Sequence, residues 1–469
     1  MHRVSMAIAN QLTLLALTLC FALAPISMAC AEVTRVVVKS SGPMGIFKGR
    51  QYLWVTAMME GTVAREGGER GQYRVPVVLM YPDRNPNGFG FVDVVNSAAF
   101  DVYKEGEAPG GKRSVYYVGD LIFSDYLRRE GFTYMAVQWS RMVTSMLGAD
   151  YGVIENGRDG YEIVKDAARF LRQPGTLEGA VPFRPHVVGR VIGFGQSQTA
   201  FLLRELVRSG QNREAGGVLF FDGLLAGVGG GGCLILNNDE TPRPEPGPTN
   251  PTFQNRVPCG GPLPEDGKFI AIQTQSDIDT FKGYLSRHQT PSSRQYELAG
   301  VAHIPPDIID MQLFGATRQN PVSFRPVFKA MLRNLVEWIV SGTEPPDSRY
   351  LEGTVDGEGQ VHFATDTDGN VTGGLRLPHM PTVLPNGARA GAPLGVYRGL
   401  DPDYLEPLNV FALLGGTFEP FSAQELAARY PSQEAYVQLV RNAAAALLAD
   451  RLILQEDYDA YLQAAQRWR

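Results

Sequence analysis

Ser197 lies at the boundary between two kinds of sequence pattern. The stretch GRVIGFGQSQTAFLLREL (residues 189–206) has an apolar, β-branched run before this serine and a helix-like repeat of apolar residues after it. Its centre, GQSQT, differs at one position from the G-x-S-x-G elbow, a sharp strand-to-helix turn that exposes a nucleophilic serine. Thr199 stands where the second glycine is usual and demands a little more space. We predict that Ser197 is a nucleophile, with an ordinary helix N-cap as the alternative.

A serine hydroxyl becomes nucleophilic when a base accepts its proton and a third group orients that base. His303 follows a strand-like run and a small-residue turn, RQYELAGVAH, and Asp277 and Asp279 follow the strand-like run KFIAIQT. The chain order serine, acid, histidine is the order that accompanies a nucleophile elbow. We therefore predict His303 as the base and Asp277 as the acid, with Asp279 in reserve. Asp222 is a second reserve acid, because it ends the predicted strand GGVLFFDG; capping the turn at Gly223 is its alternative role.

The same chemistry needs hydrogen-bond donors for the oxyanion that develops on the attacked carbonyl. The backbone N–H of Gln198 directly follows the nucleophile at the start of the predicted helix, so we expect it to be the first donor. The second donor is expected from the loop after the run FVDVVNS, around Asn96 and Ser97.

Glycine and cysteine patterns exclude several cofactor and metal chemistries. The run Gly229–Gly232 is not followed by Gly-Lys-Ser or Gly-Lys-Thr, so it is not a P-loop. Gly193 and Gly195 begin a G-x-G, but Gln198 occupies the third glycine position of the dinucleotide fingerprint. No C-x-x-C or histidine-rich spacing indicates a metal site. We therefore predict neither a metal nor an organic cofactor.

Strand-like and helix-like segments alternate from Gly90 onward, which predicts crossover units and a mainly parallel sheet. The expected strands are residues 90–97, 132–140, 188–195, 216–223 and 268–274, and the expected helices are residues 117–131, 160–172, 197–210 and 324–342. Three earlier β-rich runs, residues 33–40, 51–63 and 73–82, are expected to add antiparallel strands at the edge of that sheet. The predicted fold class is therefore α/β, with the candidate catalytic residues at strand ends.

Two segments interrupt this alternation. Residues 226–267 are rich in glycine and proline and hold Cys233 and Cys259, so we predict a loop-rich insertion and a candidate lid. Because these cysteines are flanked by loops rather than core strands, one disulfide is favoured over two buried thiols. Residues 346–469 form a C-terminal extension with strand-like, turn-like and helical parts, in which Ser422 and Glu425 make a capping box.

Several motifs together resemble a known group, the bacterial α/β-hydrolase-domain family whose elbow is G-x-S-Q-[ST]-A. The elbow here is GQSQTA, and the resemblance extends to FDGLL, AGVAH, DGNVTGGLRLP and the tail PFSAQELAARYPSQEAYVQLV, covering roughly residues 44–467. It implies an α/β-hydrolase fold in which residues 32–469 form a single domain, with the C-terminal extension packed on the core. Relatives often carry a glutamate just before the aspartate of the acid loop. This chain has Gln275 there, which favours Asp277 as the acid.

The first 31 residues have the features of a signal peptide. His2 and Arg3 precede an apolar run at residues 12–24, and Ala-Cys-Ala at residues 29–31 offers a cleavage site. The apolar run is shorter than the roughly 20 residues that a membrane span needs. We therefore expect an exported protein, periplasmic or extracellular, with a lipid anchor at Cys30 as a minor alternative.

The 469 residues carry 43 Lys and Arg against 49 Asp and Glu, a formal net charge of −6. Without a strong basic block, nucleic acid is not an expected partner. Together the observations predict an exported serine hydrolase that cleaves a small-molecule carboxylic ester through an acyl-enzyme. The alternatives are an amidase, a lactonase or an acyltransferase with the same three residues, or a non-catalytic binding protein with this fold. The sequence does not indicate an oligomeric state.

Overall fold

The computed structural model describes residues 32–65, 68–96, 122–175, 177–214, 216–236, 256–309, 318–401 and 413–468. Four sequence-based expectations concern residues outside these ranges. They are the signal peptide at residues 1–31, the lipid anchor at Cys30, the oxyanion donor Ser97 and the part of the insertion at residues 237–255.

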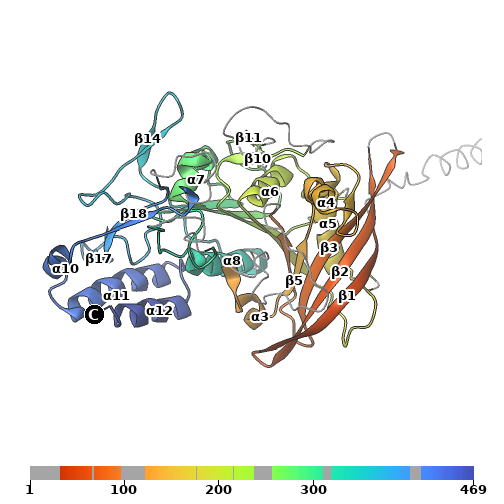
Figure 1. Cartoon of the computed structure of the whole chain (residues 1–469), viewed down its shortest axis with the longest axis horizontal. Coiled ribbons are helices and arrows are strands. Elements are labelled where there is room, and N and C mark those ends of the chain that lie inside the picture. The colour runs from red at the N-terminus through yellow and green to blue at the C-terminus, as the bar shows by residue number, and fades with distance from the viewer. Residues whose placement is uncertain are drawn as a thin grey trace, which may run out of the picture.

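The first three strands form a long antiparallel meander at one end of the molecule (Figure 1). They are β1 (Glu32–Phe47), β2 (Arg50–Ala64) and β3 (Arg70–Pro82). Their valine- and aromatic-rich sequences suit a pleated, half-buried surface. The short strands β6 (Val153–Ile154) and β7 (Leu177–Glu178) pair with β3 and β1. This meander is the predicted antiparallel extension, and its strands are longer than the sequence pattern predicts.

Parallel strands continue the sheet beyond the meander. They are β4 (Phe89–Val94), β5 (Thr133–Val137), β8 (Arg190–Gln196), β9 (Gly223–Gly227), β12 (Lys268–Thr274) and β13 (Ser293–Leu298). Within the described ranges the sheet has 11 strands, in the order β13-β12-β9-β8-β4-β5-β3-β2-β1-β7 with β6 beside β3. All neighbouring pairs from β13 to β5 are parallel, and β5 pairs with β3 antiparallel. The predicted α/β class with a mainly parallel sheet is confirmed.

Helices cover both faces of this sheet (Figure 1). α5 (Asp159–Arg172) and α6 (Gln198–Arg208) lie on one face, where they share a hydrophobic core with β2, β3 and β8. α3 (Tyr126–Glu130) and α8 (Arg325–Ser341) lie on the other face, in a second core. α4 (Arg141–Leu147) follows β5, and α7 (Gln275–Thr280) and the 3-10 helix η3 (Gly283–Ser286) follow β12. Burial on both faces explains the nearly continuous apolar sequences of the parallel strands.

The C-terminal part of the chain packs against the second core. Its hairpins are β14 (Gly353–Val355) with β15 (Val361–Phe363), β16 (Thr382–Val383) with β17 (Arg389–Ala390), and β18 (Gly395–Arg398) with β19 (Thr417–Pro420). Its helices are α10 (Ala423–Arg429), which begins at the predicted capping box, α11 (Gln433–Ala449) and α12 (Gln455–Ala465). Tyr397, Leu447 and Ile453 share a hydrophobic cluster with Phe328 and Trp338 of α8. The C-terminal part and α8 therefore contribute to one hydrophobic core.

One strand is misplaced by the sequence pattern. The apolar run at residues 216–223 predicts a strand that ends near Asp222, but the strand is the following segment, β9. A Cβ on either terminal glycine of β9 would lie less than 3 Å from side-chain atoms of α8, from Leu335 at one end and Phe328 at the other. Gly223 and Gly227 lower the β propensity of β9, which hides it from a sequence-based prediction. The same two glycines allow α8 to pack closely on the strand.

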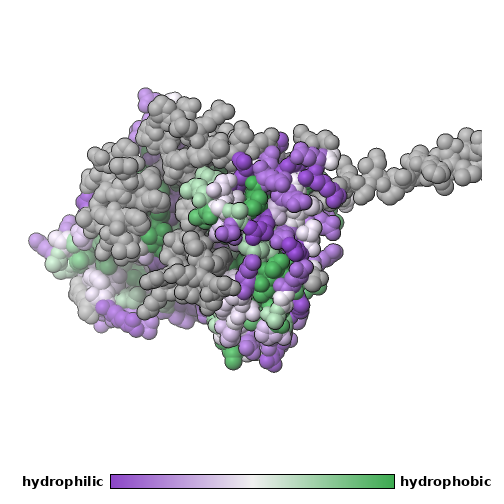
Figure 2. All heavy atoms as spheres, turned by 45° about the vertical axis from the view of Figure 1, so that its right-hand side comes forward, coloured by the Kyte–Doolittle hydropathy of each residue, from purple (hydrophilic) through white to green (hydrophobic). Residues whose placement is uncertain are grey.

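The described part of the chain contains no helix that is both long enough and apolar enough to span a membrane. On the face shown in Figure 2, hydrophilic residues surround several small, separate hydrophobic patches. The exposed large apolar side chains include Ile46, Val153 and Val187. Apolar side chains scattered singly in this way are normal on protein surfaces.

A buried carboxyl connects α5 to the meander. Asp166 accepts a hydrogen bond of 2.7 Å from the Tyr73 hydroxyl of β3 and pairs with Arg169 one turn later in the helix. Burial raises the pKa of the Asp166 carboxyl to about 6, while the contacts with Arg169 and Tyr73 oppose that shift. The folded protein then holds a proton that the unfolded chain has released. This group therefore makes the folded state less stable as the pH rises from about 4 to about 6.

We expect Asp166→Asn to remove this pH dependence. Between about pH 4.5 and about pH 7.5, the free energy of unfolding of the wild type should fall by about 2 kcal/mol relative to that of the variant. Urea denaturation at the two pH values measures this difference. Glu214→Gln, which removes a half-buried partner of the same Arg169, is the control and should follow the wild type. Identical pH profiles for wild type and Asp166→Asn would contradict the prediction.

Candidate active site

Ser197 lies in a tight turn between β8 and α6. Its backbone has φ 54° and ψ −116°, a strained conformation for a residue with a Cβ, and its side chain makes no capping hydrogen bond. Its N–H donates to the Gly227 carbonyl oxygen at 2.8 Å. Gly195 must be glycine, because a Cβ there would lie 2.6 Å from the backbone carbonyl group of Thr199. This geometry agrees with the elbow prediction rather than with an ordinary N-cap.

The hydroxyl of Thr199 is part of the same turn. Its Oγ1 accepts a hydrogen bond of 2.9 Å from the backbone N–H of Gln196 and donates one of 3.1 Å to the carbonyl oxygen of that residue. Thr199 is fully buried. Thr199 occupies the usual place of the second glycine. The sequence predicts only that its side chain needs more space, but its hydroxyl also closes the elbow by bonding to the backbone of Gln196.

We expect Thr199→Val to destabilise the protein by about 1–3 kcal/mol, because the variant leaves the buried N–H of Gln196 without this acceptor. Thr199→Ser keeps the hydroxyl and is the matched control, with a smaller effect. Urea denaturation of the three proteins gives the free energies of unfolding. A valine variant as stable as the serine variant would show that the hydroxyl contributes nothing to the turn.

The imidazole of His303 lies between Ser197 and Asp277. Its Nε2 is 3.1 Å from the Ser197 Oγ, and its Nδ1 is 2.6 Å from the Asp277 Oδ1. The three residues follow β8, β12 and β13, parallel strands whose carboxyl ends lie at the same edge of the sheet. His303 and Asp277 are both buried. Both distances are within hydrogen-bond reach, so the structure brings together the three side chains that the sequence analysis selected.

The first turn of α7 holds the Asp277 carboxylate. Its Oδ2 accepts hydrogen bonds from the backbone N–H and the Oγ1 hydroxyl of Thr274, at 2.6 and 2.7 Å, while its Oδ1 faces His303. The sequence analysis missed Thr274. A signal was present, because T-x-x-D directly after an apolar run is a capping-box pattern.

The two reserve acids lie elsewhere. Asp279 is half-buried and lies two residues beyond Asp277 in α7. The carboxylate that bonds to the His303 imidazole is that of Asp277. The expectation that Asp222 ends its strand is wrong, because β9 begins after it. Asp222 therefore lies at the amino edge of the sheet, opposite the edge of Ser197. There it pairs with Arg172 at 2.6 Å and accepts from the N–H of Val191.

Phe281 is a further residue of the site that the sequence analysis missed. Its ring contacts the His303 imidazole edge-to-face, with ring centroids 5.2 Å apart. Phe281 also contacts Phe201 of α6 edge-on, with ring centroids 6.1 Å apart. An aromatic ring in this place restricts rotation of the imidazole away from Ser197. No local pattern around Phe281 distinguishes it from an ordinary core residue.

Two of the expected oxyanion donors, Gln198 and Asn96, lie around the same turn. Gln198 is the first residue of α6, so its backbone N–H belongs to the positive end of the helix dipole. Asn96 follows β4, and its Nδ2 donates to the Gln196 carbonyl oxygen at 3.2 Å. The indole N–H of Trp139 donates to the Val95 carbonyl oxygen at 2.8 Å and holds this loop in place. The oxyanion assignment of Gln198, Asn96 and Ser97 stays a prediction.

Two observations concern cofactor binding. A Cβ on Gly229 would lie 2.4 Å from the Cβ of Ala200 in α6, and a Cβ on Gly231 would lie 2.1 Å from the Lys282 carbonyl oxygen. The glycine run therefore has a packing role beside the elbow helix. In the residues that the structure describes, no three His, Cys, Asp or Glu side chains gather as metal ligands would.

The insertion is anchored to α6, the helix that follows Ser197. β10 (Gly232–Leu234) pairs with β11 (Arg256–Pro258), and the predicted disulfide joins Cys233 to Cys259. Arg204 of α6 donates to the carbonyl oxygen of Gly261 at 3.1 Å. Residues 226 and 227 belong to β9, so the insertion begins slightly later than predicted.

Comparison with protein families connects this geometry to a known group. The model of the alpha/beta hydrolase domain family matches residues 122–463, a range that includes Ser197, Asp277 and His303. The resemblance noted from the sequence motifs is thereby confirmed. A search of curated proteins finds no match.

Several solved structures also match, at low identity. A glucuronoyl esterase from Teredinibacter turnerae is 10% identical, with 43% of this chain and 49% of the other chain covered and a TM-score of 0.24. The rice cell wall degrading esterase LipA from Xanthomonas oryzae is 11% identical, with coverage of 42% and 50% and a TM-score of 0.25. Feruloyl esterase B from Aspergillus oryzae is 12% identical, with coverage of 44% and 35% and a TM-score of 0.21. This chain spans half or less of the length of each of these proteins.

Proposed function

Because the chain belongs to the alpha/beta hydrolase domain family, we propose that it is an exported serine hydrolase that cleaves a carboxylic ester. The observation that carries this proposal is the hydrogen-bonded series from Ser197 through His303 to Asp277, at 3.1 and 2.6 Å. The strained backbone of Ser197 adds support, since such strain is common at functional sites.

The first half of the reaction forms an acyl-enzyme. The Nε2 of His303 accepts the proton of the Ser197 hydroxyl while the Oγ attacks the ester carbonyl carbon. Asp277 accepts the Nδ1–H of the imidazole and stabilises its positive charge. The backbone N–H of Gln198 and a donor from the loop at Asn96 and Ser97 bind the oxyanion. When the carbon–oxygen bond of the leaving group breaks, His303 returns the proton to the departing alkoxide.

The second half of the reaction releases the acid. A water molecule gives its proton to the Nε2 of His303 and attacks the acyl carbon, and the same donors bind the second oxyanion. The bond to the Ser197 Oγ then breaks, and the serine takes its proton back from the imidazole. No step needs a group other than these side chains, backbone donors and water.

The insertion and the disulfide support two finer parts of the proposal. The described part of residues 226–267 is attached to α6, so we place one wall or lid of the substrate site in this insertion. Disulfides persist in oxidising compartments, so the Cys233–Cys259 bridge supports export directed by the proposed signal peptide at residues 1–31.

A fluorophosphonate probe tests the nucleophile directly, because it reacts covalently with an activated serine. The wild-type protein should be labelled and Ser197→Ala should not. A folded wild type that resists the probe would speak against the hydrolase and for the alternative of a binding protein.

A substrate panel tests the ester assignment. Aryl esters of increasing acyl length should be hydrolysed faster than matched amides and lactones, because an aryloxide leaves more easily than the amine of an amide or the alkoxide of a lactone. Turnover of the amides alone would replace the esterase proposal with an amidase, and turnover of the lactones alone would replace it with a lactonase.

A further inference from the structure

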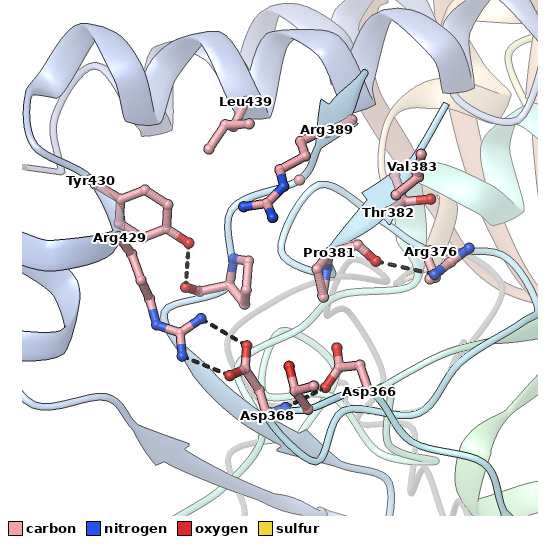
Figure 3. Close-up of a pocket in the computed structure, with 14 residues that line it drawn as sticks. Asp366, Asp368, Arg376, Pro381, Thr382, Val383, Arg389, Arg429, Tyr430 and Leu439 are labelled. Atoms are coloured by element: carbon pink, nitrogen blue, oxygen red, sulfur yellow. Dashed lines mark hydrogen bonds and ion pairs between the residues drawn. The ribbon is translucent and has the colours of Figure 1, made fainter. Parts of the chain in front are cut away.

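A cavity of about 520 Å³ lies within the C-terminal part of the chain, away from the proposed catalytic residues (Figure 3). Its walls come from the turn at residues 366–368, the β16–β17 hairpin, the end of α10 and one residue of α11. Its size is within the range of small-molecule sites. None of Ser197, Asp277, His303 and the expected oxyanion donors lines it.

Three charged groups of the lining already have partners. Arg429 of α10 makes a two-pronged ion pair with Asp368, at 2.6 and 2.7 Å (Figure 3). Asp366 accepts from the backbone N–H groups of Asp368 and Asn370 through its Oδ1. These contacts hold the carboxylates of the 366–368 turn at the cavity wall.

Two further arginines of the lining, Arg376 and Arg389, make no direct ion pair among the described residues. The Arg376 guanidinium donates to the Pro381 carbonyl oxygen at 3.2 Å, and the Arg389 side chain points from β17 into the cavity (Figure 3). Arg376 is half-buried; burial lowers the pKa of its guanidinium, and the negative charges of Glu352 and Asp366 oppose that shift. Counting Arg376, Arg389 and Arg429 against two aspartates leaves the lining with one net positive charge. Arginine binds carboxylates through paired N–H donors, and neither Arg376 nor Arg389 has such a pairing with a carboxylate of the described residues.

We propose that this cavity binds a small hydroxylated carboxylic acid. The carboxylate of the ligand accepts hydrogen bonds from Arg376 and Arg389, and its hydroxyl groups donate to the carboxylates of Asp366 and Asp368. A multiply charged phosphate is disfavoured, because the two aspartates lie in the same wall. The site does not depend on the proposed catalytic activity, since it shares no residue with it.

Isothermal titration calorimetry with D-gluconate as the probe, at constant ionic strength, tests the proposal on the whole protein. Gluconate should bind saturably, and it should bind more tightly than sorbitol, which lacks the carboxylate, or inorganic phosphate. Arg389→Gln and Arg376→Gln should each weaken binding of gluconate by about tenfold or more. Arg441→Gln is the matched control, because this exposed arginine of α11 lies outside the cavity lining.

Three results would overturn the proposal. They are the absence of saturable gluconate binding, phosphate binding tighter than gluconate binding, and equal affinity of the wild type and the Arg389→Gln variant. Thermal unfolding checks that each variant is folded. Arg389 is exposed, so we expect the Arg389→Gln variant to fold. This variant therefore tests the proposal even if Arg376→Gln does not fold. Fluorophosphonate labelling of Arg389→Gln should equal that of the wild type, which separates this site from the catalytic one.

Discussion

Replacing Ser197 with alanine is expected to lower kcat for the best ester of the substrate panel by about 10⁶-fold. The variant removes the Oγ that lies 3.1 Å from the His303 Nε2, so no acyl-enzyme can form. The remaining rate would come only from substrate binding and oxyanion stabilisation. Steady-state kinetics on purified protein, with an acyl-enzyme burst measured for the wild type, give the comparison.

Ser209→Ala is the matched control for this prediction. Ser209 lies at the other end of α6, where its hydroxyl donates to the Glu205 carbonyl oxygen. This control loses a serine hydroxyl from the same helix, so it reports any effect on activity that comes only from reduced stability. We expect its kcat to be nearly that of the wild type. An alanine at residue 197 that retains a tenth of the wild-type rate would rule out Ser197 as the nucleophile.

Replacing Asp277 with asparagine is expected to lower kcat by about 10⁴-fold. The asparagine oxygen can still accept from the N–H and hydroxyl of Thr274, which the Asp277 Oδ2 does now, so its amide N–H₂ would face the imidazole. His303 would then accept at Nδ1 and carry its proton at Nε2, the tautomer that cannot take the proton of Ser197. The loss should appear in kcat more than in KM.

Asp279→Asn provides a control from the same turn of the chain. It removes one carboxylate from α7, as Asp277→Asn does, but from a half-buried residue that does not bond to His303. Its kcat should stay within a few-fold of the wild type. Equal losses in the two variants would mean that the charge of this helix matters and that Asp277 has no special role.

Much of the fold follows from patterns that are local in the sequence. The strand at residues 268–274 is β12 with the bounds that its apolar run predicts, and the helix after Ser197 is α6. Burial on both faces of the sheet imposes continuous apolar runs on the parallel strands, which makes them recognisable. β9 escaped detection for the opposite reason. Its glycines accommodate α8, a contact from more than one hundred residues away in the chain.

The candidate catalytic residues also fall into two groups, those that the local sequence pattern indicates and those that depend on tertiary packing. Ser197 and His303 could be selected from the sequence because each follows a distinct strand-like run, in the order that an elbow motif requires. Asp277 and Asp279 follow the same run, so local pattern alone left both open as the acid. The distance of 2.6 Å between Asp277 and the imidazole separates them. The support from Thr274 and Phe281 depends on how α7 packs against the loop of His303.

The amino-acid sequence by itself determined the class of fold, the elbow serine and the order of its partners, because these depend on periodicity and on steric rules within short segments. Only the tertiary structure decided which aspartate faces His303, which edge of the sheet holds Asp222, and that Arg376 and Arg389 line one cavity. Side-chain direction and distance between segments far apart in the chain arise from packing, and no local pattern of residues encodes them.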